Sequence, residues 1–203
     1  MNRRMNHHKS TPNRSVILVG VALSIFLTLL SALYFRQFLK LIRIDHVNAL
    51  FFFCLLMWVI LGLIFIYCLK FEKQKLLLWP EKNHPAFYIL KSIIALMLIL
   101  LVGAPIIGIT LKLFGFNPDS KKLHDIVTSL RNNKVLAIFI SLTAGVTEEL
   151  IFRGYLISRL QLFFKNSTTT IIISSILFGI LHINYGTIAQ VIIPIFMGLV
   201  FGI

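Results

Sequence analysis

Two adjacent carboxylates occur where carboxylates are costly. Glu148 and Glu149 follow an uncharged run that begins at Val135 and is mostly apolar. A charged side chain in the middle of a membrane costs about 2.5 kcal/mol or more, so two in succession need a partner or a water-filled cavity. Arg153 can be the partner of Glu149, because residues four apart lie on the same face of a helix.

Helical geometry gives the two carboxylates different roles. Consecutive residues are rotated by about 100° around a helix axis, so Glu148 points away from the face that holds Glu149 and Arg153. We expect Glu149 to form a structural ion pair and Glu148 to be free to act as a general base. The alternative is that the helix ends at the membrane surface here, with all three charges solvated.

A histidine on the next apolar segment can complete an acid–base site. Phe178 and His182 are four residues apart, at the end of the segment Thr168 to His182. Histidine exchanges a proton near neutral pH. If the helices that carry Glu148 and His182 are antiparallel neighbours, the two side chains can approach each other across them. The other five acidic residues, Glu72 among them, lie in predicted loops or at helix ends and suggest no chemistry.

The composition identifies the environment of these residues. Of the 203 residues, 58% are apolar and 13% are charged, and the mean hydropathy is +0.89. Soluble globular proteins average about 45–50% apolar and about 25% charged residues, and disordered chains are poorer still in apolar residues. The net charge of +13 is scattered over the loops, which favours anionic lipid over nucleic acid as the partner. We therefore predict an integral, multi-pass membrane protein, and we place it in a bacterial cell membrane.

The elements that must position the site are six hydrophobic segments, and the predicted fold is an all-α, polytopic transmembrane helical bundle. The segments are Val16–Phe35, Val47–Leu69, Ile89–Leu113, Val135–Phe152, Thr168–His182 and Thr187–Ile203. We divide the chain into a basic tail (1–15), scaffold helices that face lipid (16–134) and a catalytic core (135–203). Basic residues only weakly favour a cytoplasmic N-terminus. In the last segment the Gly198 and Gly202 spacing predicts close helix packing, with cavity contact by Gln190 as the second choice.

These motifs resemble a known family. Glu148-Glu149-x-x-x-Arg153, followed by Phe178-x-x-x-His182, is similar to the CAAX protease and bacteriocin-processing (CPBP, or Abi) family of intramembrane proteases. The resemblance implies that Glu148 and His182 activate a water molecule and that Glu149 and Arg153 support the site. We assign Phe178 to substrate binding.

The resemblance leaves the cofactor and the substrate open. Family members are often called metalloproteases, so Glu148 and His182 would be metal ligands if Zn²⁺ is used. A metal-free glutamate mechanism is equally open. The substrate would be a membrane-adjacent peptide or protein, such as a prenylated C-terminus or a bacteriocin leader.

One family feature is missing. The family carries a later His, followed four residues on by Asn or Asp, that is thought to stabilise the oxyanion. No such pair follows His182, and the sequence stops at Ile203 inside an apolar run. We therefore expect a chain truncated before this motif.

Two other function classes use the same residues. A non-catalytic membrane immunity or scaffold protein would bind a cationic, bacteriocin-like peptide through the carboxylates. A proton-coupled transporter would also bury Glu and His. The transporter is less favoured because the sequence shows no inverted repeat.

Overall fold

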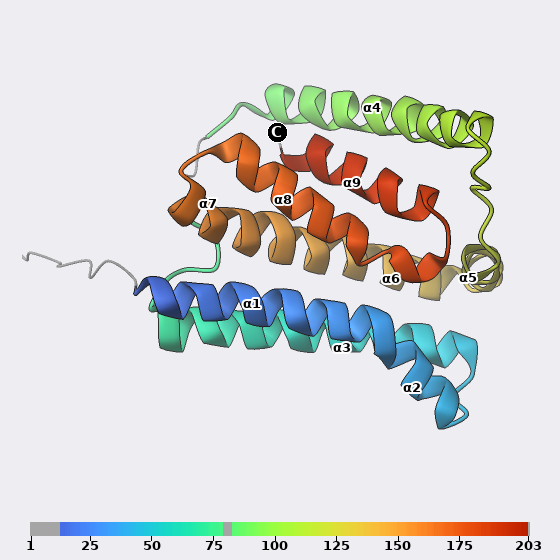
Figure 1. Ribbon diagram of the computed structural model, residues 1–203, viewed down its shortest axis with the longest axis horizontal. Coiled ribbons are helices and arrows are strands. Elements are labelled where there is room, and N and C mark those ends of the chain that lie inside the picture. Colours follow the sequence, from blue (N-terminus) through green and yellow to red (C-terminus); the bar gives the residue numbers. More distant parts are fainter. Residues whose placement is uncertain (1–12, 79–82, 203) are drawn as a thin grey trace, which may run out of the picture.

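The computed structural model describes residues 13–78 and 83–202, and these residues form helices and no strands (Figure 1). The all-α bundle that the sequence predicts is therefore confirmed. In chain order the elements are α1 (Arg14–Leu30), η1 (Ser31–Phe35), α2 (Arg36–Leu41), α3 (His46–Tyr67), η2 (Cys68–Glu72), α4 (Ala86–Leu113), α5 (Lys121–Asn132), α6 (Lys134–Glu148), η3 (Glu149–Ile157), α7 (Ser158–Phe164), α8 (Ser167–Ile180), η4 (Ile183–Tyr185) and α9 (Ala189–Gly202). Most of the predicted basic tail lies outside the described residues.

Five of the six predicted segments are long and apolar enough to cross a membrane. These helices are Arg14–Leu41, Val47–Glu72, Ala86–Leu113, Lys134–Phe164 and Ser167–Tyr185. The sixth segment forms α9, which has 14 residues.

The fourth span is longer than predicted, and this changes the setting of the paired carboxylates. The sequence places its end at Phe152, whereas the helix continues to Phe164 through the π-helix η3. Glu148 and Glu149 therefore lie near the middle of a 31-residue helix. The alternative interpretation, a solvated helix end, is wrong for the described structure.

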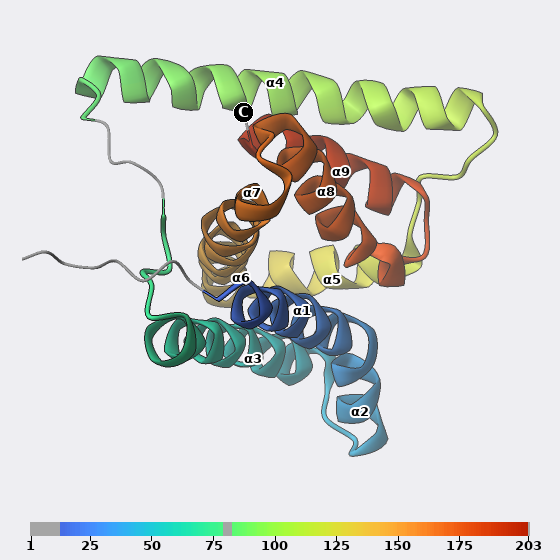
Figure 2. The same cartoon turned by 60° about the vertical axis from the view of Figure 1, so that its left-hand side comes forward.

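The helices pack in an order that does not follow the sequence. α1 lies beside α3, α3 contacts α6, and α8 contacts both η3 and α9. In Figures 1 and 2, α4 lies along one edge of the bundle, over α9. No residue of α4 is buried, whereas the main apolar cluster combines Ile17, Ile64, Tyr155 and Phe178 from α1, α3, η3 and α8. The core thus forms around the helix that carries the paired carboxylates. The predicted boundary between scaffold helices (16–134) and catalytic core (135–203) stays a prediction. The apolar cluster contains residues from both parts.

Small residues allow the close approach of α8 and α9. A Cβ atom added to Gly198 would lie 2.8 Å from the Cβ and Oγ atoms of Ser175. One added to Gly202 would lie 2.6 Å from Ile171. The packing role predicted for the Gly198 and Gly202 spacing is therefore confirmed.

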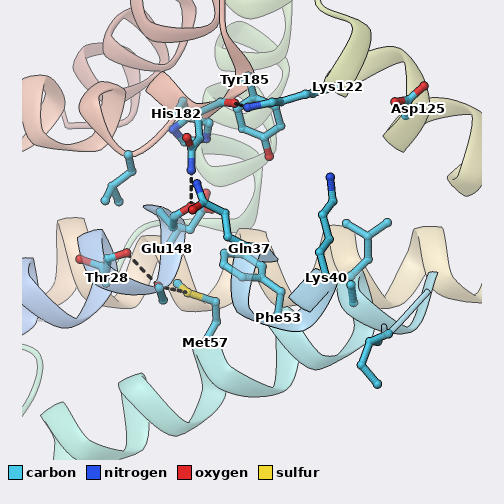
Figure 3. Close-up of a pocket in the computed structure, with 17 residues that line it drawn as sticks. Thr28, Gln37, Lys40, Phe53, Met57, Lys122, Asp125, Glu148, His182 and Tyr185 are labelled. Atoms are coloured by element: carbon cyan, nitrogen blue, oxygen red, sulfur yellow. Dashed lines mark hydrogen bonds between the residues drawn. The ribbon is translucent and has the colours of Figure 1, made fainter. Parts of the chain in front are cut away.

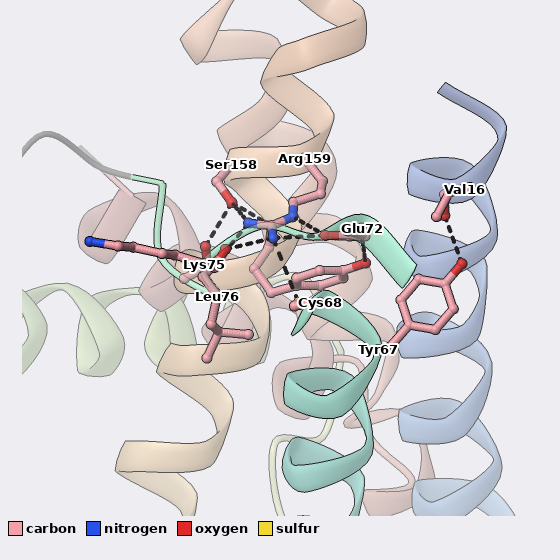
Figure 4. Close-up of polar contacts among 10 residues, drawn as sticks. Val16, Tyr67, Cys68, Glu72, Lys75, Leu76, Ser158 and Arg159 are labelled. Carbon is pink, nitrogen blue, oxygen red and sulfur yellow. Dashed lines mark hydrogen bonds and ion pairs between the residues drawn. The ribbon is translucent and has the colours of Figure 1, made fainter. Parts of the chain in front are cut away.

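A buried ion pair joins the end of α3 to the end of the site helix. Arg159 donates to Glu72 Oε2 through Nε (3.0 Å) and Nη2 (2.8 Å), and Tyr155 donates to Glu72 Oε1 at 2.7 Å (Figure 4). The same guanidinium donates to the carbonyls of Leu76 and Lys75. Glu72 lies at a helix end, as the sequence predicts, but its side chain is fully enclosed, which the sequence did not indicate. We call this group the Glu72–Arg159 cluster.

Candidate active site

A cavity of about 290 Å³ lies among α1, η1, α2, α3, α5 and the ends of α6 and α8 (Figure 3). Its apolar wall includes Leu50, Phe53 and Met57 of α3. Its polar lining residues are Thr28, Ser31, Gln37, Lys40, Lys122, Asp125, Glu148, His182, Asn184 and Tyr185. The cavity thus mixes an apolar body with a small number of charged and hydrogen-bonding groups, as ligand and active sites usually do.

Glu148 and His182 reach this cavity from different helices. Glu148 is the last residue of α6, directly before the π-helix, and His182 follows the end of α8. π-Helical turns are rare and occur frequently at functional sites. The structure therefore brings together the two residues that the sequence selected for acid–base chemistry (Figure 3).

The tautomer of His182 follows from its hydrogen bond. Its Nδ1 lies 2.9 Å from the backbone oxygen of Phe178. A carbonyl oxygen only accepts, so Nδ1 carries the hydrogen when this bond forms. In the neutral ring, Nε2 then has its lone pair available for a water molecule or a proton.

Glu149 and Arg153 form the ion pair that their spacing predicts. Arg153 Nη1 lies 3.0 Å from Glu149 Oε1. The arginine side chain is 5% exposed and the glutamate side chain is 42% exposed. Neither Nη1 nor Nη2 of Arg153 makes a hydrogen bond within the described parts of the chain, so charge and ring contacts hold the guanidinium. Its Cζ lies 4.6 Å from the Phe178 ring centroid and 5.6 Å from that of Phe201.

Phe178 lies behind the cavity and is not one of its lining residues. Its buried ring makes edge contacts with Phe152 (centroids 5.2 Å apart) and His182 (5.0 Å apart), and the Arg153 guanidinium covers it. The ring therefore links the ion pair to the histidine. This placement favours a positioning role over the substrate contact assigned from the sequence, and Gln190 is likewise not a lining residue.

The helices assigned to a lipid-facing scaffold form much of the cavity wall. Thr28 and Ser31 line it, and both hydroxyls donate to carbonyls of their own helix. The signal that could have identified this wall is the run Ser24, Thr28, Ser31, which places three hydroxyl residues on one face of an otherwise apolar helix. All three are buried.

The donor set does not complete a zinc site. A catalytic zinc ion usually takes three protein ligands, from His, Cys, Asp or Glu. Among residues 13–78 and 83–202, no three or more of these residues are grouped so that they could hold a metal ion. Glu148 and His182 supply two donors to the cavity. We therefore derive no step through a metal.

The comparisons with known proteins point to one family. Residues 131–203 match the family model described as "Rce1-like: Type II CAAX prenyl endopeptidase Rce1-like". This match confirms the resemblance to the CAAX proteases, and it supports a CAAX-protease-like endopeptidase in general. Together with the apolar helices it supports an integral membrane protein. The comparisons with curated proteins and with solved structures gave no match.

Proposed function

We propose that this protein is an intramembrane endopeptidase in which Glu148 and His182 activate water against a peptide carbonyl. One observation carries the proposal: an acid and a base from two different helices line the same cavity of about 290 Å³. The family match over residues 131–203, which contains both residues, supports the same reaction class.

The proposed reaction needs only groups that the cavity supplies and one water molecule. The Glu148 carboxylate takes a proton from the water while His182 Nε2 orients it. The water oxygen forms a bond to the carbonyl carbon of the substrate. The proton on Glu148 then passes to the amide nitrogen as the C–N bond breaks, which yields a carboxylate and an amine.

The residues behind the cavity have supporting roles in this proposal. Arg153 neutralises the charge of Glu149. Glu148 is then the carboxylate that is left to accept a proton in the cavity. Phe178 holds the imidazole from behind through its ring and its backbone oxygen. Packing against Arg153 couples the ring to the ion pair.

The proposed substrate is a membrane-adjacent peptide. The apolar cavity wall suits an apolar segment or a lipid-modified residue, and the exposed charged lining residues Lys40, Lys122 and Asp125 suit the polar chain that leads from it. The proposed mechanism uses no metal; if Zn²⁺ were used, Glu148 and His182 would be two of its ligands.

The test compares purified variants on quenched fluorescent peptides in detergent micelles, with and without a C-terminal prenylcysteine. General acid–base residues contribute about 10²–10⁴-fold to the rate, so Glu148→Gln and His182→Ala should each lower kcat by at least 10²-fold. Asp119→Asn and His124→Ala are matched controls, because both residues are exposed and outside the cavity lining. Normal cleavage by both site variants would refute the proposal. Peptide binding that depends on Glu148, without any product from the wild type, would instead indicate the non-catalytic immunity or scaffold protein.

A further inference from the structure

We infer that Asn184 is a positioning residue, which fixes His182 in the cavity by binding two backbone carbonyls of η1. This inference rests on the proposed function, since it assigns a role in the same reaction. It concerns a residue two positions after the histidine, in the turn η4 that joins α8 to α9.

The carboxamide of Asn184 forms hydrogen bonds with a segment that is far away in the sequence. Its Nδ2 donates to the backbone oxygens of Ala32 at 2.8 Å and Leu33 at 3.2 Å. Because carbonyl oxygens only accept, these two bonds require the NH₂ group and fix the orientation of the amide. One side chain thereby ties the turn after α8 to the first helix.

The acceptors lie in a π-helix. Ala32 and Leu33 belong to η1 (Ser31–Phe35), where the first span departs from regular α-helical hydrogen bonding. In a regular α-helix each interior carbonyl accepts from the amide four residues ahead. A π-turn shifts this pattern, and side chains can then reach the helix carbonyls. The irregular turn in η1 is thus where a side-chain donor can be accommodated.

A second set of bonds holds the same turn from the opposite side. The backbone oxygen of Asn184 accepts from Lys122 Nζ at 2.7 Å, and the backbone oxygen of Tyr185 accepts from the Ser120 hydroxyl. The Tyr185 ring stacks on His182, with centroids 5.8 Å apart and planes at 22°. The turn is therefore held between η1 and the start of α5, with the imidazole against one of its side chains (Figure 3).

His182 lies where α8 gives way to this turn, so both the helix and the turn fix its position. α8 ends at Ile180, and His182 has φ −91° and ψ 0°, outside the helical region. The bond from Nδ1 to Phe178 O holds the imidazole on the side of α8, and the turn that follows holds the residue on its other side. A misplacement of about 1 Å in an active site can cost about 10²-fold in rate. The Asn184 side chain links this backbone directly to η1, which also lines the cavity.

The experiment uses substitutions that separate the amide from the size of the side chain. Asn184→Asp keeps the shape, removes both N–H donors and places an acceptor against two carbonyls. Asn184→Gln keeps the donors on a side chain one methylene longer. Asn166→Asp is the matched control, since the Asn166 side chain only accepts bonds from Thr168 N and Thr169 N at the start of α8, and Asp can accept them too.

We expect Asn184→Asp to lower kcat by about 10²-fold with a smaller change in KM, because the histidine that orients the water is misplaced. Asn184→Gln should recover part of kcat, and Asn166→Asp should match the wild type. A wild-type kcat in Asn184→Asp would overturn the inference. So would a loss that disappears when the rate is divided by the amount of folded enzyme.

A second readout keeps the inference testable if the wild type proves inactive. The imidazole ¹⁵N resonances of His182, assigned by their loss in His182→Ala, report its tautomer and its bond to Phe178. They should shift in Asn184→Asp and stay in place in Asn166→Asp. Unshifted resonances would overturn the positioning role, whatever the outcome of the proteolysis assay. Shifted resonances in an inactive wild type would support the positioning role and reject the proposed function.

Discussion

Removal of Arg159 is the sharpest test of what holds this bundle together. Its side chain is 1% exposed and that of Glu72 is 0% exposed. In Arg159→Met a chain of comparable length without charge replaces the guanidinium, so Glu72 stays enclosed, keeps the bond from the Tyr155 hydroxyl and loses its charged partner. Breaking a buried ion pair by removing one partner costs about 3–5 kcal/mol.

The magnitude follows from what is left behind. Arg159 donates hydrogen bonds to the Glu72 carboxylate and to the backbone oxygens of Lys75 and Leu76. Each buried acceptor left without a donor costs about 1–3 kcal/mol unless water replaces the donor. We therefore expect the free energy of unfolding to fall by at least about 3 kcal/mol. Arg131→Met, at an exposed arginine on α5, should change it by less than about 0.5 kcal/mol.

The assay is reversible denaturation in mixed micelles, followed by tryptophan fluorescence, for a double-mutant cycle. Glu72→Gln and Arg159→Met are measured singly and together. Because the double variant buries no unpaired charge, its loss should be smaller than the sum of the single losses by about 2–3 kcal/mol. Additive losses, or an Arg159→Met variant as stable as Arg131→Met, would refute the energetic role of the Glu72–Arg159 cluster.

Three further predictions concern the metal, the helix packing and the loop before α3. Dialysis against 1,10-phenanthroline should leave proteolysis unchanged, since no three His, Cys, Asp or Glu residues of the described chain are grouped so that they could hold a metal ion, and a loss that Zn²⁺ restores would show that a metal is used. Gly198→Ala should destabilise the protein by about 1–3 kcal/mol, because the new Cβ would lie 2.8 Å from Ser175 atoms. The control Gly108→Ala, with nothing within 4 Å of its Cβ, should be neutral or stabilising. Equal unfolding midpoints of the two variants would contradict this prediction. Hydrogen bonds from the backbone and then the side chain of Asn48 hold the pKa of Asp45, the N-cap of α3, below its usual 3.8. Asp45 should therefore stabilise the fold above the unfolded pKa and lose this effect as the pH falls through the folded pKa; unfolding midpoints of the wild type and Asp45→Ala should converge in acid, and a constant difference would contradict this.

The sequence is most informative where the contacts are local. The Glu149–Arg153 ion pair could be predicted because four residues along a helix bring two side chains together regardless of the rest of the fold. The placement of Glu148 followed from the same geometry, and the structure puts it in the cavity with His182. That second pairing needed an assumption about neighbouring helices, which the contacts of α8 with η3 now support.

Contacts between distant segments could not be predicted in this way. Glu72 and Arg159 are 87 positions apart, and Asn184 and Ala32 are 152 apart. Each residue taken alone has the pattern of an ordinary helix end or turn. Only the packing of α1 and α3 against the later helices shows that these side chains are enclosed. The π-helical turns are equally invisible to a hydrophobic pattern, since an apolar run reads the same at either helical period.

The Glu72–Arg159 cluster and Asn184 should affect different measurable properties: the cluster the stability of the fold, and Asn184 the activity. The Glu72–Arg159 cluster lies where η2 meets α7 (Figure 4), whereas Asn184 lies in η4, after the end of α8, and lines the cavity. In the first cluster both charges are enclosed and hydrogen-bonded, and neither lines the cavity. Arg159→Met should therefore lower the unfolding free energy while the folded fraction keeps its kcat. Asn184→Asp should lower kcat with a smaller change in stability, because its amide is only partly buried. Equal effects of both variants on both quantities would show that the bundle transmits strain from end to end, and would contradict this separation.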